Sequence, residues 1–418
     1  MPSLSRGVAF SVGAQGLVMA LTLVTTTLLA RWLGPSSYGV VAGALSWAGL
    51  FATLAHLSLG PVAVREAATH RGEGHGWLAP TLGTLLGTLA VTTVVWWAIA
   101  AILARTPLPF LFEGVPTTPL AIGFVALPFF VWRQYGSHVL IATGRLPWYN
   151  LAEVVAAAAM LATVLVAGSG IGQSTALVVL VGGQGLSALV TAYAVARTAP
   201  RPVVEAATTR RILRSGLLLH MGAVGTFLFA EVGILVVLAE LGPDPAALYQ
   251  VSIRSLFQSM VVPTAVTMFL SGDVARLGAD AAWERHRRLV LGIVALMAAG
   301  TAVVALLAPI LFARVFGAPY EESGHIFRAA AASSLAMTLS VLMTPQWIGR
   351  GWFWQSATLT LATGLLHVGL AMVLTASHGM QGAIIAFVAT EVVVLAINGW
   401  LVLWLERRRT RTAPGVPA

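Results

Sequence analysis

Apolar residues run along this chain in long stretches that are separated by short polar breaks. A stretch of about 20 apolar residues is long enough to cross a bilayer core of about 30 Å. The breaks carry turn residues, as at Gly34-Pro35, Pro107-Leu108-Pro109 and Gly242-Pro243. The pattern predicts twelve transmembrane helices, over residues 8–30, 38–62, 77–103, 117–141, 148–168, 174–196, 213–241, 246–270, 287–314, 325–348, 352–375 and 380–404.

The longest polar segment between two predicted spans, residues 197–214, falls near the middle of the chain. We therefore expect an all-α polytopic membrane protein with two six-helix bundles, over residues 1–200 and 213–406, joined by a cytoplasmic linker over residues 201–212. Residues 407–418 are predicted to form a disordered cytoplasmic tail, because they hold arginines, prolines and few apolar residues.

Composition agrees with a chain that lies mostly in a bilayer. Only 9% of the 418 residues are charged and the mean hydropathy is +0.86, whereas a soluble domain has about 25% charged residues. The net charge of +9 does not indicate nucleic-acid binding, because most of the arginines lie between spans, where they can contact the headgroups of membrane lipids. The chain has no cysteine, which excludes disulfides and thiolate metal sites.

The placement of arginine predicts the orientation of the chain. With the N-terminus inside, eighteen arginines, Arg71 among them, fall in cytoplasmic segments, and three fall in external loops. Positive charge is retained on the cytoplasmic side, so both termini are expected there. The apolar run after Arg6, about 24 residues, exceeds a signal-peptide core and is read as an uncleaved first helix.

Charged residues inside predicted spans are the candidates for function, because an ionised side chain at mid-bilayer costs about 3 kcal/mol or more. Gln250, Arg254 and Gln258 are spaced by four and share one helix face. A guanidinium on this face suits an anionic group such as a phosphate. The alternative is a structural ion pair with a neighbouring helix.

Glu231 and His220 are eleven residues apart, which is almost three whole helical turns, so they share a face. A carboxylate and an imidazole on one intramembrane face suit coupling to protons or cations. Equally, Glu231 could pair with Arg254.

Four further intramembrane charges have weaker patterns. Arg133 either lines a cavity or snorkels to an interface, and Arg328 lies close enough to Glu321 and Glu322 for a local salt bridge. Glu153 and Glu391 share faces with Asn150 and Asn398 respectively. Both glutamates are candidates for ion coupling, and for Glu391 hydrogen bonds between helices are the structural alternative.

Motifs for covalent chemistry are missing from the sequence. It has no phosphate-binding Gly-x-x-x-x-Gly-Lys and no His-Glu-x-x-His. We therefore expect a transporter with no catalytic residues, no metal site and no cofactor.

Several segments resemble the polysaccharide or oligosaccharide flippases of the MATE-like (MOP) superfamily. Residues 30–39 read Ala-Arg-Trp-Leu-Gly-Pro-Ser-Ser-Tyr-Gly, similar to that family's Ala-Arg-x-Leu-Gly-Pro-x-x-Tyr-Gly. Residues 142–145 read Ala-Thr-Gly-Arg, and residues 379–383 read Gly-Met-Gln-Gly-Ala, which also resemble family segments. The first motif is fairly specific and the others are loose.

The resemblance implies two bundles around a central cavity in a bacterial cytoplasmic membrane. It implies a cargo, a saccharide linked to a polyprenyl pyrophosphate, that moves outward by alternating access for cell-surface polysaccharide synthesis. Polysaccharide polymerases and glycosyltransferases would be partners. Arg254 would hold the headgroup, with Arg133 and Arg328 as further candidates.

Three other functions are compatible with the sequence. One is a multidrug or small-solute antiporter of the same superfamily, although drug exporters of cations favour acidic pockets. The others are a membrane glycosyltransferase or polymerase, which would usually carry a larger external loop, and a non-transporting scaffold in polysaccharide export.

Overall fold

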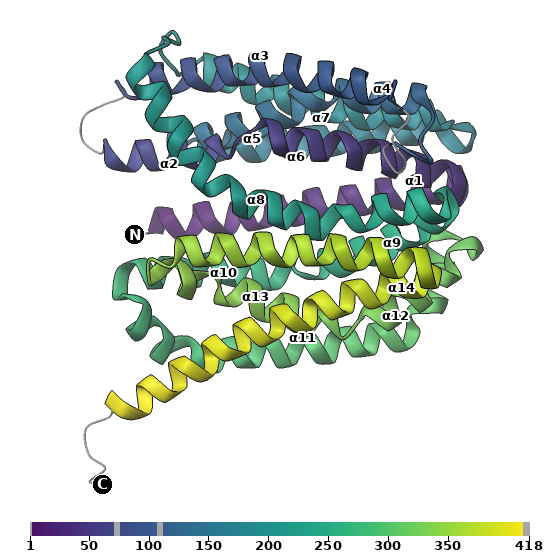
Figure 1. The fold of residues 1–418 in the computed structure, drawn as a ribbon. Coiled ribbons are helices and arrows are strands. Elements are labelled where there is room, and N and C mark those ends of the chain that lie inside the picture. The colour runs from purple at the N-terminus through teal and green to yellow at the C-terminus, as the bar shows by residue number, and fades with distance from the viewer. Residues whose placement is uncertain (1, 71–75, 107–111, 413–418) are drawn as a thin grey trace. The chain divides into compact units, whose positions relative to one another are not determined.

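The computed structural model describes residues 2–70, 76–106 and 112–412, and every long element in it is an α-helix (Figure 1). The chain divides into two compact units, Met1–Ala247 and Leu248–Ala418. Arg71, the predicted turn at Pro107-Leu108-Pro109 and the end of the predicted tail, 413–418, lie outside the described residues.

The first unit holds eight helices among its described residues. They are α1 (Pro2–Ala55), α2 (Leu59–Thr69), α3 (Leu78–Leu103), α4 (Thr117–Val125), α5 (Leu127–Ala142), α6 (Leu146–Ala167), α7 (Gln173–Ala196) and α8 (Ala206–Leu241). Helix α6 packs against α1 and α7, and α8 packs against α1, α2 and α3. The long helix α8 therefore belongs to the same compact unit as the helices before it.

The second unit contains most of α9 (Pro243–Ser259) and the helices α10 (Val261–Leu277), α11 (Ala279–Phe316), α12 (Glu321–Ala330), α13 (Ser333–Gly349) and α14 (Phe353–Thr412). Its core includes Leu270, Trp283, Leu342, Met343 and Leu401. These apolar side chains come from α10, α11, α13 and α14, so they hold four helices together.

Most residues of every predicted span are helical, and the spans predicted over 38–62, 117–141, 246–270 and 325–348 each contain a short break between two helices. Among the described residues, eight helices are long and apolar enough to cross a membrane, and α12 with α13 makes a ninth if this pair, bent by 62°, is one span. Large apolar side chains remain exposed on these helices, as Val94 (64%) and Leu306 (73%) do. Such side chains suit contact with lipid tails. Together with the long apolar helices, they make the chain an all-α, multi-span membrane protein.

Two of the long helical runs each contain two predicted spans that meet at a glycine. In α1 the glycine is Gly34 (φ 71°), and in α14 it is Gly379 (φ 59°). Helices α1 and α14 each turn back on themselves (Figure 1). A positive φ is accessible to glycine without steric cost, which explains glycine at both turns. Across the second turn, a Cβ on Gly382 would lie 1.8 Å from the backbone oxygen of Leu374, so the two arms touch.

Helix ends that are predicted to share a side of the membrane lie together. In the first unit, Gly39 meets Pro243, and Gly114 meets Leu238. At the opposite ends, Arg211 pairs with Glu66 and Val203 donates a backbone hydrogen bond to Ala79.

The predicted linker, 201–212, has two parts. Its first part is an extended segment that lies on α3, and its second part forms the first two turns of α8. Helix α14 continues through the predicted tail as far as Thr412.

Candidate functional site

The polar face of α9 is the first candidate site. Arg254 is exposed, and Gln250 and Gln258, one turn away on each side, are partly exposed. The opposite face of the helix is buried, as shown by Ile253 and Leu256. The structure therefore brings the three predicted residues onto one face that points away from the core of the second unit.

The buried face of α9 is fixed by Ser252. Its Oγ lies 2.6 Å from the carbonyl oxygen of Leu248 and 2.7 Å from that of Ser323, on α12. This side chain is fully buried, so it ties α9 to its neighbour. The anchoring sets the direction in which Arg254 points.

Arg133, on α5, forms an ion pair with Glu153, on α6, with 3.3 Å between Nη1 and Oε2. Ser187, on α7, donates a hydrogen bond to the other carboxylate oxygen at 3.1 Å. Three helices of the first unit meet at this carboxylate. The structure thus joins one residue predicted to bind substrate with one predicted to couple an ion.

Glu231 contacts α1, and His220 contacts the break that follows α1. Ser46 donates a hydrogen bond to Oε2 of Glu231 at 3.1 Å. The Oγ of Ser58 lies 3.3 Å from Nδ1 of His220. The two residues therefore occupy one face of α8, as their spacing predicts, while their role in ion coupling stays a prediction.

Glu391, on α14, is 3% exposed. Its Oε2 is buried and has no hydrogen-bond partner in the described part of the chain. The neighbouring Asn398 accepts a hydrogen bond from Nε1 of Trp347 at 3.1 Å, and so provides the predicted bond between helices. An intramembrane carboxyl without a partner remains a candidate for ion coupling.

Arg328 lies apart from the other predicted residues. Its Nε donates to the carbonyl oxygen of Ala305 at 2.9 Å, and its Nη2 donates to that of Leu306 at 3.0 Å. Both acceptors belong to the backbone of α11. The contact supports a structural role, and substrate binding by Arg328 stays a prediction without support from its surroundings.

Two polar clusters in the structure do not follow from the pattern of the sequence. One consists of His56, His138 and His220, which lie close together at the break between α1 and α2. The other surrounds the buried Asp273, on α10, whose carboxylate lies 2.6 Å from Nε2 of His286 and 2.5 Å from Nη2 of Arg276. Each cluster joins residues from separate helices, so helical periodicity alone does not group them.

The Asp273 cluster continues across the ends of four helices. Arg350 contacts Asp280 and lies over the ring of Trp404, and Trp283 donates to Glu406 at 3.0 Å. Burial lowers the pKa of the Arg350 guanidinium, and the Asp280 carboxylate acts in the opposite direction. These contacts tie together the arginine-rich end of the second unit.

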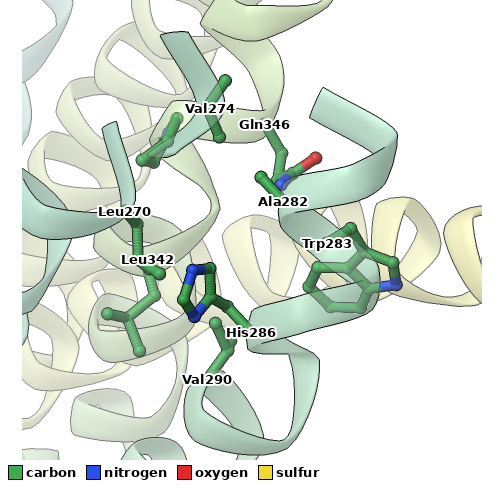
Figure 2. Close-up of a pocket in the computed structure, with 9 residues that line it drawn as sticks. Leu270, Val274, Ala282, Trp283, His286, Val290, Leu342 and Gln346 are labelled. Carbon is green, nitrogen blue, oxygen red and sulfur yellow. The ribbon is translucent and has the colours of Figure 1, made fainter. Parts of the chain in front are cut away.

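Beside this cluster is a small cavity of about 10 Å³, between α10, α11 and α13 (Figure 2). Figure 2 shows the His286 ring beside Leu342 and Val290, with Gln346 across the cavity. This volume is room for about one water molecule, so the cavity is a packing feature rather than a cargo site. The described residues contain no group of three or more His, Asp or Glu placed to hold a metal ion.

The sequence also matches a known family. Residues 4–270 match the family described as polysaccharide biosynthesis protein, which is more than half of the chain. The chain belongs to this family. A comparison with curated proteins finds no match. The resemblance predicted from the short motifs is confirmed.

Solved structures share the fold of this family member over nearly its whole length. The lipid II flippase MurJ, in an inward closed conformation, is similar with a TM-score of 0.77 and 10% identity, over 94% of this chain and 87% of that one. An inward-facing multidrug resistance MATE family transporter of the MOP superfamily gives 0.74 and 15%, over 95% and 96%. A MOP superfamily transporter from Pyrococcus furiosus gives 0.66 and 16%, over 96% and 95%. The protein therefore has the MATE-like fold that these structures share.

Proposed function

We propose that this protein is a flippase that moves a saccharide linked to polyprenyl pyrophosphate from the inner to the outer leaflet of a bacterial cytoplasmic membrane. It would work by alternating access, without covalent chemistry, in the synthesis of cell-surface polysaccharide. Family membership supports the pathway, and the exposed polar face of α9 supports the cargo.

The position of Arg254 on α9 has an energetic consequence. Arg254 lies inside a run, Pro243–Leu277, that is long and apolar enough to cross the membrane, yet its side chain is exposed. A guanidinium in contact with hydrocarbon costs about 3 kcal/mol or more. A water-filled path removes this cost, and a phosphate in that path accepts two parallel hydrogen bonds from the guanidinium. Gln250 and Gln258 would hydrogen-bond sugar hydroxyls beside it.

We propose that the chain crosses the membrane twelve times. The count rises from nine to twelve if Gly34 and Gly379 each separate two spans and if α4 with α5 forms one more. We propose that six spans belong to each of two bundles, over residues 1–200 and 213–406, around a central cavity and with both termini in the cytoplasm. Rocking of the bundles would expose the polar path to each side in turn. Polymerases and glycosyltransferases of the same pathway would be its partners.

A second candidate is an ion-coupled multidrug or small-solute antiporter. The fold that the chain shares with a multidrug resistance MATE transporter favours it. The cation on the exposed face of α9 argues against cationic drugs as cargo, because like charges repel.

The test is transport by the purified protein in liposomes. A fluorescent saccharide on polyprenyl pyrophosphate is placed in the outer leaflet, and its movement across the bilayer is followed by quenching. Wild-type protein is expected to flip this lipid. Arg254→Ala should slow flipping by about 10- to 100-fold at limiting cargo, since a hydrogen bond to a charged group is worth about 1.5–3 kcal/mol.

Two controls define the outcome. Arg314→Ala removes an exposed arginine from α11 instead and should flip at the wild-type rate. Efflux of cationic drugs without flipping of the lipid would favour the antiporter. Wild-type flipping by Arg254→Ala would refute the role given to α9.

A further inference from the structure

A strained break separates α1 from α2 in the first unit. Residues His56, Leu57 and Ser58 lie between the two helices, with φ of 46° at Leu57 and 52° at Ser58. Left-handed backbone costs roughly 1–2 kcal/mol at each residue with a side chain. Two such residues in succession, inside a membrane protein, require specific contacts to hold them.

Those contacts centre on His56. The N–H of Ser58 donates to Nδ1 of the His56 ring at 2.9 Å. The carbonyl oxygen of His56 accepts from the hydroxyl of Tyr135 at 2.9 Å and from the N–H of Leu59 at 3.1 Å. A ring nitrogen accepts a hydrogen bond only when it carries no proton. The contact with Ser58 therefore fixes His56 in its neutral form, with the ring proton on Nε2.

Two other helices press closely on the break. On the α5 side, His138 packs on Gly60, where a Cβ would lie 2.7 Å from the ring Nδ1. On the α8 side, a Cβ on Gly216 would lie 2.6 Å from the carbonyl oxygen of Leu57. Glycine at both positions permits this approach, so the break is built into the packing of three helices.

The titratable groups that face His56 come from both neighbours. From α8, the His220 ring lies 5.6 Å from the His56 ring, centre to centre. From α5, Tyr135 and His138 face it, and His138 is near enough to act on it electrostatically. Further along α2 and α8, Glu66 and Arg211 form an ion pair at 2.7 Å. A positive charge on His56 would therefore meet the imidazoles of His138 and His220, while the Glu66 carboxylate is already paired with Arg211.

We propose that His56 is a proton-binding site and that a proton on its Nδ1 releases the break between α1 and α2. Once protonated, Nδ1 of His56 is a donor and can no longer accept the N–H of Ser58. Two N–H donors then face each other, and the hydrogen bond between them is lost. The backbone strain at Leu57 and Ser58 then favours an ordinary helical conformation, and α1 continues into α2. This inference deepens the proposed function, because it assigns the proton as the coupling ion and His56 as its site.

The chain has no cysteine, which allows a direct distance measurement. Cysteines at the exposed positions Ser36 and Ala68 would place spin labels on either side of the break. The distance between them is measured by pulsed electron resonance at about pH 8 and about pH 4, to either side of the ordinary histidine pKa of about 6.5. The mean distance is expected to lengthen in acid as the helix straightens.

Two substitutions at His56 carry opposite expectations. In His56→Asn the side-chain oxygen can still accept the N–H two residues on, as in an Asx turn, but it does not titrate. This variant should keep the short distance at both pH values. His56→Leu has no acceptor and should give the long distance at both. His325→Asn, an exposed histidine of the second unit, should respond as the wild type does.

An unchanged wild-type distance would overturn the proposal, and this measurement needs no substitution of His56. A pH response that persists in His56→Asn would also overturn it. The readout is independent of cargo. A pH-dependent distance without lipid flipping would contradict only the proposed function, whereas flipping with a distance that ignores pH would contradict only the proton site.

Discussion

Arg328, on α12, donates a hydrogen bond to the backbone oxygen of Ala305, on α11, at 2.9 Å. Pro309 lies four residues after Ala305, inside the same helix, and proline has no N–H to donate. That carbonyl has therefore lost its ordinary helical donor. The arginine of a neighbouring helix supplies the missing hydrogen bond where proline interrupts α11.

This relationship predicts that Arg328 and Pro309 are thermodynamically coupled. Arg328→Met should lower the free energy of unfolding by about 1–3 kcal/mol, because it leaves a carbonyl oxygen unsatisfied. In a Pro309→Ala background the new N–H can bond to Ala305, so the same change should cost much less. Thermal unfolding of the four proteins in detergent measures the coupling. Equal costs in both backgrounds would contradict the structural role and return Arg328 to the candidates for cargo binding.

Two glycines of α14 offer a matched pair. A Cβ at Gly382 would lie 1.8 Å from the backbone oxygen of Leu374, whereas a Cβ at Gly369 meets nothing within 4 Å. Gly382→Ala should therefore destabilise the protein by about 1–3 kcal/mol or more, since backbone cannot yield easily. Gly369→Ala should be neutral or stabilise by up to about 1 kcal/mol through helix propensity. Thermal unfolding tests the contrast, and similar effects of the two changes would refute it.

Arg133 and Glu153 are expected to act as one unit in transport. The Arg133 side chain is 38% exposed, so its pairing should contribute only about 1 kcal/mol or less to stability. Both Arg133→Gln and Glu153→Gln should slow lipid flipping, and the double variant should be no slower than the slower single one. Flipping rates of the four proteins in liposomes provide the measurement. Additive losses would indicate that the two residues serve separate steps.

Glu231→Gln tests ion coupling on α8. The amide oxygen can still accept the hydrogen bond from Ser46, so the fold should be retained. The variant cannot bind and release a proton, and flipping is expected to lose part of its dependence on pH. Glu240→Gln, an exposed glutamate at the end of the same helix, should keep the wild-type profile. A wild-type pH profile in Glu231→Gln would count against coupling at this residue.

Helical periodicity explains which parts of this structure are predictable from sequence. Apolar runs identify the helices because burying backbone in lipid leaves few alternatives to a helix. The face shared by Gln250, Arg254 and Gln258 follows from a spacing of four within one helix. The bend of 62° between α12 and α13 does not follow, since the end of α12 and nearly all of α13 lie inside the single span predicted over residues 325–348.

Contacts between distant segments are the part that the sequence did not provide. His56, His138 and His220 come from three separate segments, and their meeting depends on close packing at Gly60 and Gly216. The bond from Arg328 to Ala305 likewise depends on how α12 lies against α11. No periodic pattern encodes such pairs, because each residue satisfies its own helix equally well in other packings.

The turns at Gly34 and Gly379 bear on how the chain is made. Each joins two apolar helical arms with almost no intervening loop. A growing chain with such a turn has little hydrophilic segment to carry across the bilayer between the arms. We therefore expect each pair of arms to enter the membrane together during synthesis, as a single helical hairpin. Lengthening either turn would then alter biogenesis before it altered any property of the finished protein.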